Sequence, residues 1–195
     1  MLCAIVGCGS TAEHWHEHQS EFDLVIGVND CFQWGSAPDQ LVVIDSPKRF
    51  TPERSAIIKS TPSNFITRDD QWKNILPKYE KVNLQQFTKH LKKGHVYCSK
   101  TSSFVALSLA FNQHATDVVL FGVDLNNHAT FNPKNRIRDY EIRQYQNFCR
   151  MLADQGCKVW VSSEESALSK VLPIYQFELL GSFDDKIEVL TMCKL

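Results

Sequence analysis

The most constraining feature of this sequence is a set of short apolar runs in which hydrophobic residues follow one another without alternating with polar ones. A strand with one face in water alternates, whereas a strand covered on both faces is apolar throughout and is typical of a parallel sheet. These runs are rich in Val, Ile and Leu, and they predict six buried strands. The expected strands are Cys3–Gly7, Asp23–Val28, Leu41–Asp45, Asn64–Thr67, Asp117–Val123 and Lys158–Val161.

Longer amphipathic segments lie between the apolar runs. Phe104, Leu107 and Phe111 recur at spacings of three and four, which predicts a helix over 103–115 with N-cap candidates just before it. Two further helices are expected over 51–60 and 136–155. The alternation of strands and helices predicts an α/β fold, a Rossmann-like sandwich in which a mostly parallel sheet carries helices on both faces.

Two segments give weaker predictions. Residues 69–95 are charged and only patchily apolar, and they are interpreted as a possible helical flap. The last dozen residues are expected either to add a strand or to pack loosely. A chain of 195 residues with 43% hydrophobic residues is otherwise expected to form one domain, 1–195, around a real core.

Charge and composition exclude several classes. A formal net charge of -1 gives no support for a protein that coats nucleic acid or an anionic membrane. No apolar run approaches the roughly 20 residues of a membrane span, and the N-terminus lacks the basic region of a signal peptide. Seven cysteines without a CxxC pair indicate reduced thiols, so a cytoplasmic location is expected.

Polar residues follow four of the predicted strands. In open parallel sheets, ligands bind at the carboxyl ends of the strands, where all four endings would meet. A single Asx after a strand is more often a turn or a helix cap, but four together predict a ligand site. The residues concerned are Gly7, Cys8, Gly9, Ser10 and Thr11, then Asn29 and Asp30, then Asp45 and Ser46, and finally Asp124.

Two backbone features would suit a phosphate group. The Gly7-x-Gly9 turn allows N–H groups to approach an anion, although it is neither a full GxGxxG nor a Walker A sequence. Lys100, Thr101, Ser102 and Ser103 open the long apolar helix, so their hydroxyl and N–H groups are available at its positive end. The alternative for this second feature is ordinary capping, which needs only one hydroxyl.

Two metal sites are considered. His14 and His18 would share a helix face, but no further ligands follow with metal-site spacing, so a solvated face is favoured over a zinc site. Asp45 and Asp124 are candidates for holding Mg²⁺ together with a substrate phosphate, because Mg²⁺ is usually bound by one or two carboxylates plus phosphate oxygens.

The order of motifs resembles the bacterial sialyltransferases of glycosyltransferase family 42. It is also similar to the 6-hydroxymethyl-7,8-dihydropterin pyrophosphokinase-like domain, which occurs in motility accessory and phage proteins. The motifs are the glycine turn Gly7-Cys8-Gly9-Ser10, FDLVIGVND, LVVIDSP, KTSSFVALSLAF followed directly by DVVLFGVDL, and KVWVSSEESAL.

This resemblance implies a nucleotide-binding domain and a glycosyltransferase that uses a nucleotide sugar, with a CMP-sugar as the candidate donor and no cofactor. By position, Gly7 and Gly9 would lie against the phosphate or ribose, Asn29 against the nucleotide, Thr101, Ser102 and Ser103 around the nucleotide or donor sugar, and Asp124 facing the base or ribose. His128, in the segment after the Gly-Val-Asp strand, would be the general base. A surface loop histidine is the alternative.

The chain also departs from the family. Cys8 and Asp45 stand where the family has asparagine. The carboxylate of Asp45 is more similar to the pyrophosphokinase branch, whose reaction needs Mg²⁺ and ATP. A Mg²⁺-dependent pyrophosphokinase-like transferase is therefore the second hypothesis, and a nucleotide-binding module without catalysis is the third.

The segment 126–138 is interpreted as a short lid over donor and acceptor. Lys134, Arg136, Arg138 and Tyr140 are candidates for stabilising the departing phosphate, with a solvated loop and helix start as the alternative. The acceptor would be a saccharide or another molecule with a hydroxyl group. A homo-oligomer is a further possibility that the sequence leaves open.

Overall fold

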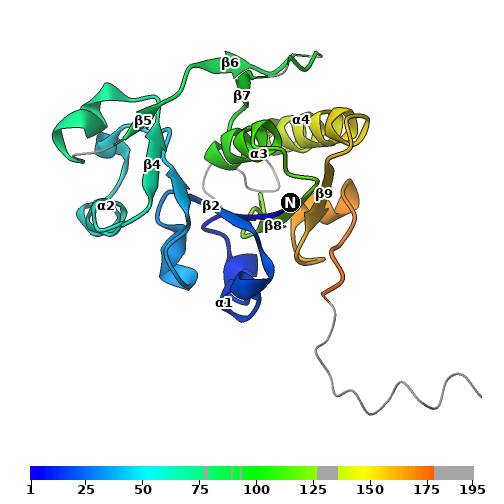
Figure 1. Ribbon diagram of the computed structural model, residues 1–195, viewed down its shortest axis with the longest axis horizontal. Coiled ribbons are helices and arrows are strands. Elements are labelled where there is room, and N and C mark those ends of the chain that lie inside the picture. The colour runs from blue at the N-terminus through cyan, green and yellow to red at the C-terminus, as the bar shows by residue number, and fades with distance from the viewer. Residues whose placement is uncertain (77–78, 89, 93, 127–135, 178–195) are drawn as a thin grey trace, which may run out of the picture.

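The computed structural model describes residues 1–76, 79–88, 90–92, 94–126 and 136–177 (Figure 1). The strands of its main sheet are β1 (Leu2–Val6), β2 (Leu24–Val28), β3 (Gln40–Val42), β4 (Asn64–Thr67), β5 (Glu80–Lys81), β8 (Asp117–Phe121) and β9 (Lys158–Val161). They lie in the order β5-β4-β3-β2-β1-β8-β9, and every neighbouring pair is parallel. A second, two-stranded parallel sheet joins β6 (Leu84–Gln86) and β7 (Val96–Cys98).

Helices cover both faces of the main sheet (Figure 1). The α-helices α3 (Ser102–Asn112) and α4 (Arg136–Ala153) lie on one face, and α1 (Trp15–His18) and α2 (Pro52–Lys59) lie on the other. Short 3₁₀ helices complete the layers at Ser10–Ala12, Gln19–Glu21, Cys31–Trp34, Pro47–Arg49, Asp70–Asn74 and Ala167–Lys170. The predicted Rossmann-like α/β sandwich is confirmed.

The central strands are apolar on both sides because each side faces a separate core. In β1, Cys3 and Ile5 pack into the core beneath α3 and α4, whereas Ala4 and Val6 pack into the core on the opposite face. All four side chains are at most 2% exposed. This is the physical reason for the continuous apolar runs in the sequence.

The chain changes direction across the sheet at β1. From β1 it passes through β2, β3 and β4 to β5 on one side, and then returns to β8 and β9 on the other. The reversal lies between β1 and β8, which pair from Leu2 with Asp117 to Val6 with Phe121. Ligands of open α/β sheets bind outside the carboxyl ends of the strands at such a point.

The segment 69–95 differs from the expected helical flap. Its described residues contain the 3₁₀ helix at Asp70–Asn74 and the strands β5 and β6. Its buried apolar residues explain the difference: Trp72 packs into one core, whereas Val82 and Phe87 pack into the other. One helical face would hold them on the same side of the sheet, which this arrangement does not allow.

The strand after Gln40 also ends earlier than expected. Val43 still donates to the carbonyl of Ile66, but the carbonyl of Asp45 accepts from the indole Nε1 of Trp72 at 2.8 Å and has left the ladder. The expectations for the last dozen residues and for most of the lid, including His128 and Lys134, lie outside the described residues.

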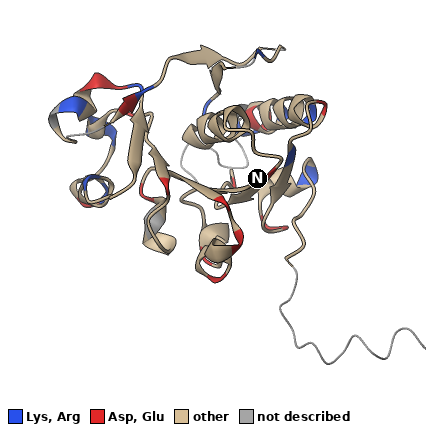
Figure 2. Ribbon diagram, viewed as in Figure 1, with Lys and Arg blue, Asp and Glu red and all other residues tan. Residues whose placement is uncertain are grey.

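Charged side chains of both signs are scattered over the ribbon (Figure 2), in keeping with the near-zero net charge. In the part of the chain that the structure describes, no helix combines the length and the apolarity needed to cross a bilayer.

The larger core depends on Phe148 of α4, which is 0% exposed. Its ring lies 4.7 Å from that of Phe104 on α3 and 4.9 Å from that of Phe87, measured between centroids. Replacing it with alanine leaves a cavity at the junction of three segments.

We predict that Phe148→Ala lowers the free energy of unfolding by about 3–5 kcal/mol. The neighbouring Asn147 is exposed on the same helix, so Asn147→Ala is the matched control and is expected to change stability by less than about 0.5 kcal/mol. Urea denaturation of both variants measures the difference. Equal, small losses for the two would contradict this packing.

Candidate functional site

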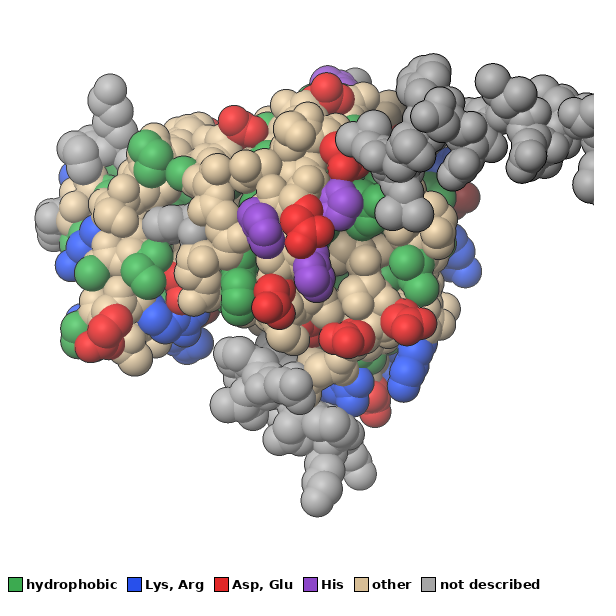
Figure 3. Space-filling model, turned by 90° about the horizontal axis from the view of Figure 1, so that it is seen from below, with side chains coloured by type: hydrophobic (Ala, Val, Ile, Leu, Met, Phe, Trp, Pro, Cys, Tyr) green, Lys and Arg blue, Asp and Glu red, His purple; other side chains and the backbone are tan. Residues whose placement is uncertain are grey.

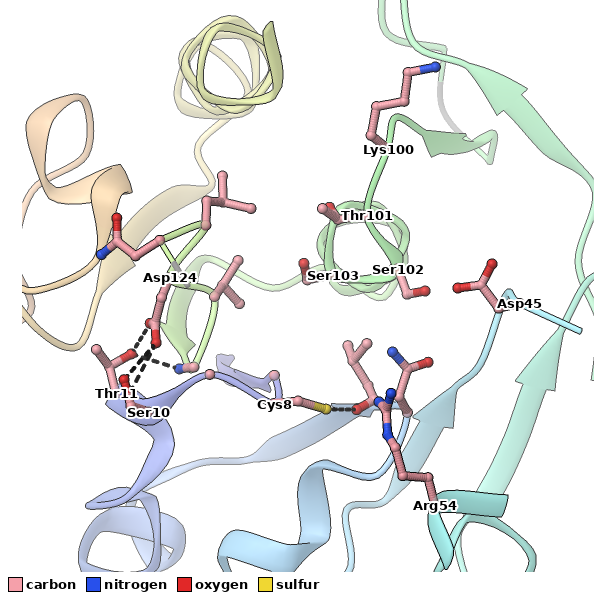
Figure 4. Close-up of a pocket in the computed structure, with 18 of the residues that line it drawn as sticks. Cys8, Ser10, Thr11, Asp45, Arg54, Lys100, Thr101, Ser102, Ser103 and Asp124 are labelled. Carbon is pink, nitrogen blue, oxygen red and sulfur yellow. Dashed lines mark hydrogen bonds between the residues drawn. The ribbon is translucent and has the colours of Figure 1, made fainter. Parts of the chain in front are cut away.

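A cavity of about 690 Å³ opens at the carboxyl ends of the central strands (Figure 4). This volume lies within the range of small-molecule sites. Of the polar strand endings predicted to form a ligand site, Thr11 lines the cavity and Asp30 and Ser46 do not. The ten residues predicted to bind the nucleotide all line it: Gly7, Cys8, Gly9, Ser10, Asn29, Asp45, Thr101, Ser102, Ser103 and Asp124. The structure therefore brings together the ends of β1, β2, β3 and β8 and the start of α3.

The glycine turn after β1 is fastened to the end of β8. Gly7 donates its N–H to the carbonyl of Phe121 at 2.7 Å, and Gly9 donates to the carbonyl of Gly122 at 2.9 Å. A Cβ on Gly7 would collide with the Gly122 carbonyl, and a Cβ on Gly9 would collide with the Asp124 carboxylate. These glycines allow two strand ends to approach each other, and their N–H groups are not free for an anion.

Asp124 holds this turn from the other side. Its carboxylate accepts from the N–H of Thr11 at 3.1 Å, from the Thr11 hydroxyl and from the Ser10 hydroxyl at 3.4 Å. The residue is only 8% exposed. The sequence placed Asp124 at the site, and the structure shows that its oxygens are largely used within the protein.

Asp45 lies on the opposite side of the cavity from Asp124 (Figure 4). Its side chain is 39% exposed and accepts from Arg49 at 3.4 Å. The two carboxylates therefore do not converge on one point, as joint coordination of Mg²⁺ would require. Among the residues that the structure describes, no three His, Cys, Asp or Glu side chains are grouped so as to hold a metal ion.

An ion pair lies below the glycine turn. Asp30 is 4% exposed and accepts from Arg54 through the Nε–H, which is shared between its two oxygens at 3.0 and 2.9 Å, and through Nη2 at 2.5 Å. Cys8 donates its thiol to the carbonyl of Val28 at 3.3 Å. Burial, together with the charge of Asp30, raises the pKa of the Cys8 thiol to about 12, so it is protonated and unreactive near neutral pH.

The start of α3 is held by α4. Thr101 caps the helix, accepting from the N–H of Phe104 at 3.3 Å, and donates to the carboxylate of Glu141 at 3.0 Å. Ser103 and Thr101 both contact the hydroxyl of Tyr145, at 2.9 and 3.1 Å. Two of the three predicted hydroxyls are therefore engaged inside the protein, although all three residues line the cavity, and the Ser102 side chain points toward the side on which Asp45 lies (Figure 4).

Asn29 has the clearest sign of a missing partner. It adopts a φ of 56°, in the left-handed region, where Asn is tolerated better than most residues. Its Oδ1 is buried and has no hydrogen-bond partner within the described ranges. Buried polar atoms are nearly always satisfied, so this oxygen at the cavity wall indicates a ligand donor.

Sequence reasoning missed Arg54, Glu141 and Tyr145. All three lie on helices and reach the site from the side, and helical periodicity carries no signal for such contacts. Of the lid candidates, Arg138 donates to the Oδ1 of Asn126 at 2.8 Å, beside the cavity. Tyr140 is partly buried on α4. The side chain of Arg136, like Lys134 and His128, lies outside the described part.

The histidines near the N-terminus pair with acidic neighbours. Figure 3 shows histidine side chains among acidic ones on this face of the molecule. His14 pairs with Glu17 at 3.2 Å and His18 with Glu21 at 2.7 Å.

No protein-family model matches the sequence, and no curated protein sequence matches it. Solved structures of a sialyltransferase are similar to it in fold. The sialyltransferase CstII from Campylobacter jejuni, in complex with the substrate analogue CMP-3FNeuAc, aligns with a TM-score of 0.55 at 10% identity, covering 89% of this chain and 86% of that one. A mutant of the α2,3/8-sialyltransferase CstII aligns at 0.54 and 9% identity, covering 90% and 87%. At this identity, the likeness establishes the fold.

The contact between the glycine turn and β8 is testable. We predict that Gly9→Ala lowers the free energy of unfolding by about 1–3 kcal/mol, because the new methyl group forces apart Asp124 and the Gly122 carbonyl. Ser10→Ala removes only a 3.4 Å hydrogen bond from an exposed residue and is the control. A Gly9→Ala variant as stable as Ser10→Ala would show that the turn is looser than described.

Proposed function

We propose that this protein is a glycosyltransferase that uses a nucleotide sugar, with a CMP-sugar as the candidate donor. The observation that carries the proposal is the meeting of ten sequence-predicted residues in one cavity at the reversal point of a Rossmann-like sheet. The fold likeness adds support, because the similar sialyltransferase was solved with a CMP-sugar analogue.

The cavity offers the groups that a nucleotide requires. The free Oδ1 of Asn29 can accept from a base amino group or a ribose hydroxyl. The Ser102 hydroxyl and the Asp45 carboxylate add a donor and an acceptor. Arg49 and Arg54 also line the cavity, and each keeps guanidinium N–H groups for a phosphate beyond those bonded to Asp45 and Asp30.

The chemistry needs a base for the acceptor hydroxyl and support for the departing phosphate. His128 follows Asn126, a cavity residue, by two positions and is proposed as the base. An unperturbed imidazole has a pKa near 6.5, which suits proton removal near neutral pH. Arg138, which is fixed on Asn126, is proposed to assist the leaving phosphate.

The first test is ligand binding. We predict that CMP stabilises the protein without added Mg²⁺, by about 2.7 kcal/mol at a hundred times its Kd. Asn29→Ala should lose most of this shift, because it removes the free acceptor, whereas Asn147→Ala should retain it. Thermal unfolding with CMP, UDP-sugars and ATP, each with and without Mg²⁺, gives the comparison.

The other outcomes of this experiment separate the rival functions. Stabilisation by ATP only when Mg²⁺ is present, lost in Asp45→Asn, would favour a pyrophosphokinase-like transferase. CMP binding with no transfer to any saccharide acceptor would favour a nucleotide-binding module. No stabilisation by any nucleotide would remove the proposal.

The second test concerns catalysis. We predict that His128→Ala lowers kcat by about 10²- to 10⁴-fold while donor affinity barely changes, and removes the acidic limb of the pH-rate profile. His90→Ala changes an exposed histidine and serves as the control. Turnover of His128→Ala near the wild-type rate, with the true donor and acceptor, would eliminate His128 as the base.

A further inference from the structure

A buried carboxylate that the proposed chemistry does not use lies directly behind the start of α3. Glu141 is 0% exposed. It accepts from the Ser99 hydroxyl at 2.5 Å, from the N–H of Lys100 at 3.1 Å and from the Thr101 hydroxyl at 3.0 Å. Burial raises the pKa of Glu141, which means that desolvation disfavours its ionised form.

When Glu141 is ionised, its carboxylate fixes the direction of a chain of hydroxyl groups. A carboxylate only accepts, so the single proton of the Thr101 hydroxyl is committed to Glu141. The Tyr145 hydroxyl, 3.1 Å from Thr101, must then donate to it, and consequently accepts from Ser103 at 2.9 Å. Ser103 can present only oxygen lone pairs to the cavity that it lines.

The same charge changes the electrostatics of this wall. The first turn of a helix attracts anions because its N–H groups and its dipole are positive there. Glu141 already places a negative charge beside that turn. The Lys100 side chain does not offset it, since Figure 4 shows this chain extending away from the space between Ser103 and Asp124.

We propose that Glu141 is a positioning residue that makes the Ser103 wall of the cavity receive an uncharged, hydrogen-bond-donating part of the ligand, such as ribose or sugar hydroxyls. A phosphate or carboxylate group is disfavoured at this wall and is directed toward Arg49 and Arg54, which are paired with Asp45 and Asp30 but keep further guanidinium N–H groups to donate. The identity of the ligand in this inference rests on the proposed function, whereas the effect of the Glu141 charge does not.

The test compares a charged probe with a neutral one. Glu141→Gln keeps the size of the side chain and can retain its hydrogen bonds if the Ser99 hydroxyl turns to accept from the new amide. Asp139→Asn, at an exposed position of the same helix, makes the same charge change and is the control. Isothermal titration in a mildly alkaline buffer measures the Kd of inorganic pyrophosphate and of cytidine for each protein.

We expect Glu141→Gln to bind pyrophosphate about tenfold more tightly, because a nearby buried charge has been removed. Cytidine affinity should stay within about twofold, since the neutral nucleoside does not sense the charge. Asp139→Asn should change neither. Pyrophosphate affinity that is unchanged, or that falls in parallel with cytidine affinity, would overturn the proposal and leave Glu141 with a purely structural role.

A second variant keeps the proposal testable if Glu141→Gln does not fold. Tyr145→Phe retains the charge of Glu141 but takes away the acceptor of Ser103, whose proton can then turn to the cavity. Pyrophosphate should bind more tightly to this variant as well, and no gain would contradict the proposal. If wild-type protein binds neither cytidine nor CMP, the proposed function fails, while the pyrophosphate comparison still decides the role of Glu141.

Discussion

The contact between the ends of β1 and β8 is the constraint on which the rest of the site depends. Two N–H groups of the glycine turn donate to carbonyls at the end of β8, and the Asp124 carboxylate accepts hydrogen bonds from Thr11 and Ser10. The two strands lie side by side at the point where the order of strands along the chain reverses, and the cavity opens beside this junction. A side chain at Gly7 or Gly9 would separate the strand ends and change the shape of the floor.

Polar residues at the site divide into those that build it and those left for a ligand. Asp124, Asp30, Thr101 and Glu141 are bonded within the protein, and they hold the turn, the floor and the start of α3 in place. Asn29 keeps an unpaired oxygen, and Ser102 and Asp45 face the cavity. Most of the polar residues that suggested a binding site therefore have a structural role. They position the few polar groups that can still contact a ligand, as preorganised sites require.

The sequence predicted the sheet, its two helical layers and the edge that carries the site, because buried parallel strands and their polar endings are local patterns. It did not predict why Gly7 and Gly9 must be glycine. The reason is their close approach to Gly122, which is more than a hundred positions away in the sequence. Glu141 and Arg54 were missed for the same reason: their partners lie on distant segments. Where a helical flap was considered possible, in 69–95, the described residues form a 3₁₀ helix and short strands, and Trp72 and Phe87 pack into opposite cores.

The central claim is that the ends of β1 and β2 and the start of α3 form one nucleotide site that needs no metal. A backbone amide NMR titration with CMP, in the presence of a chelator, tests it most directly. The account predicts saturable shifts that share one Kd at Cys8, Asn29 and Ser102, and none around the exposed His14 face. Shifts that appear only when Mg²⁺ is added, or that fall outside the cavity, would contradict it.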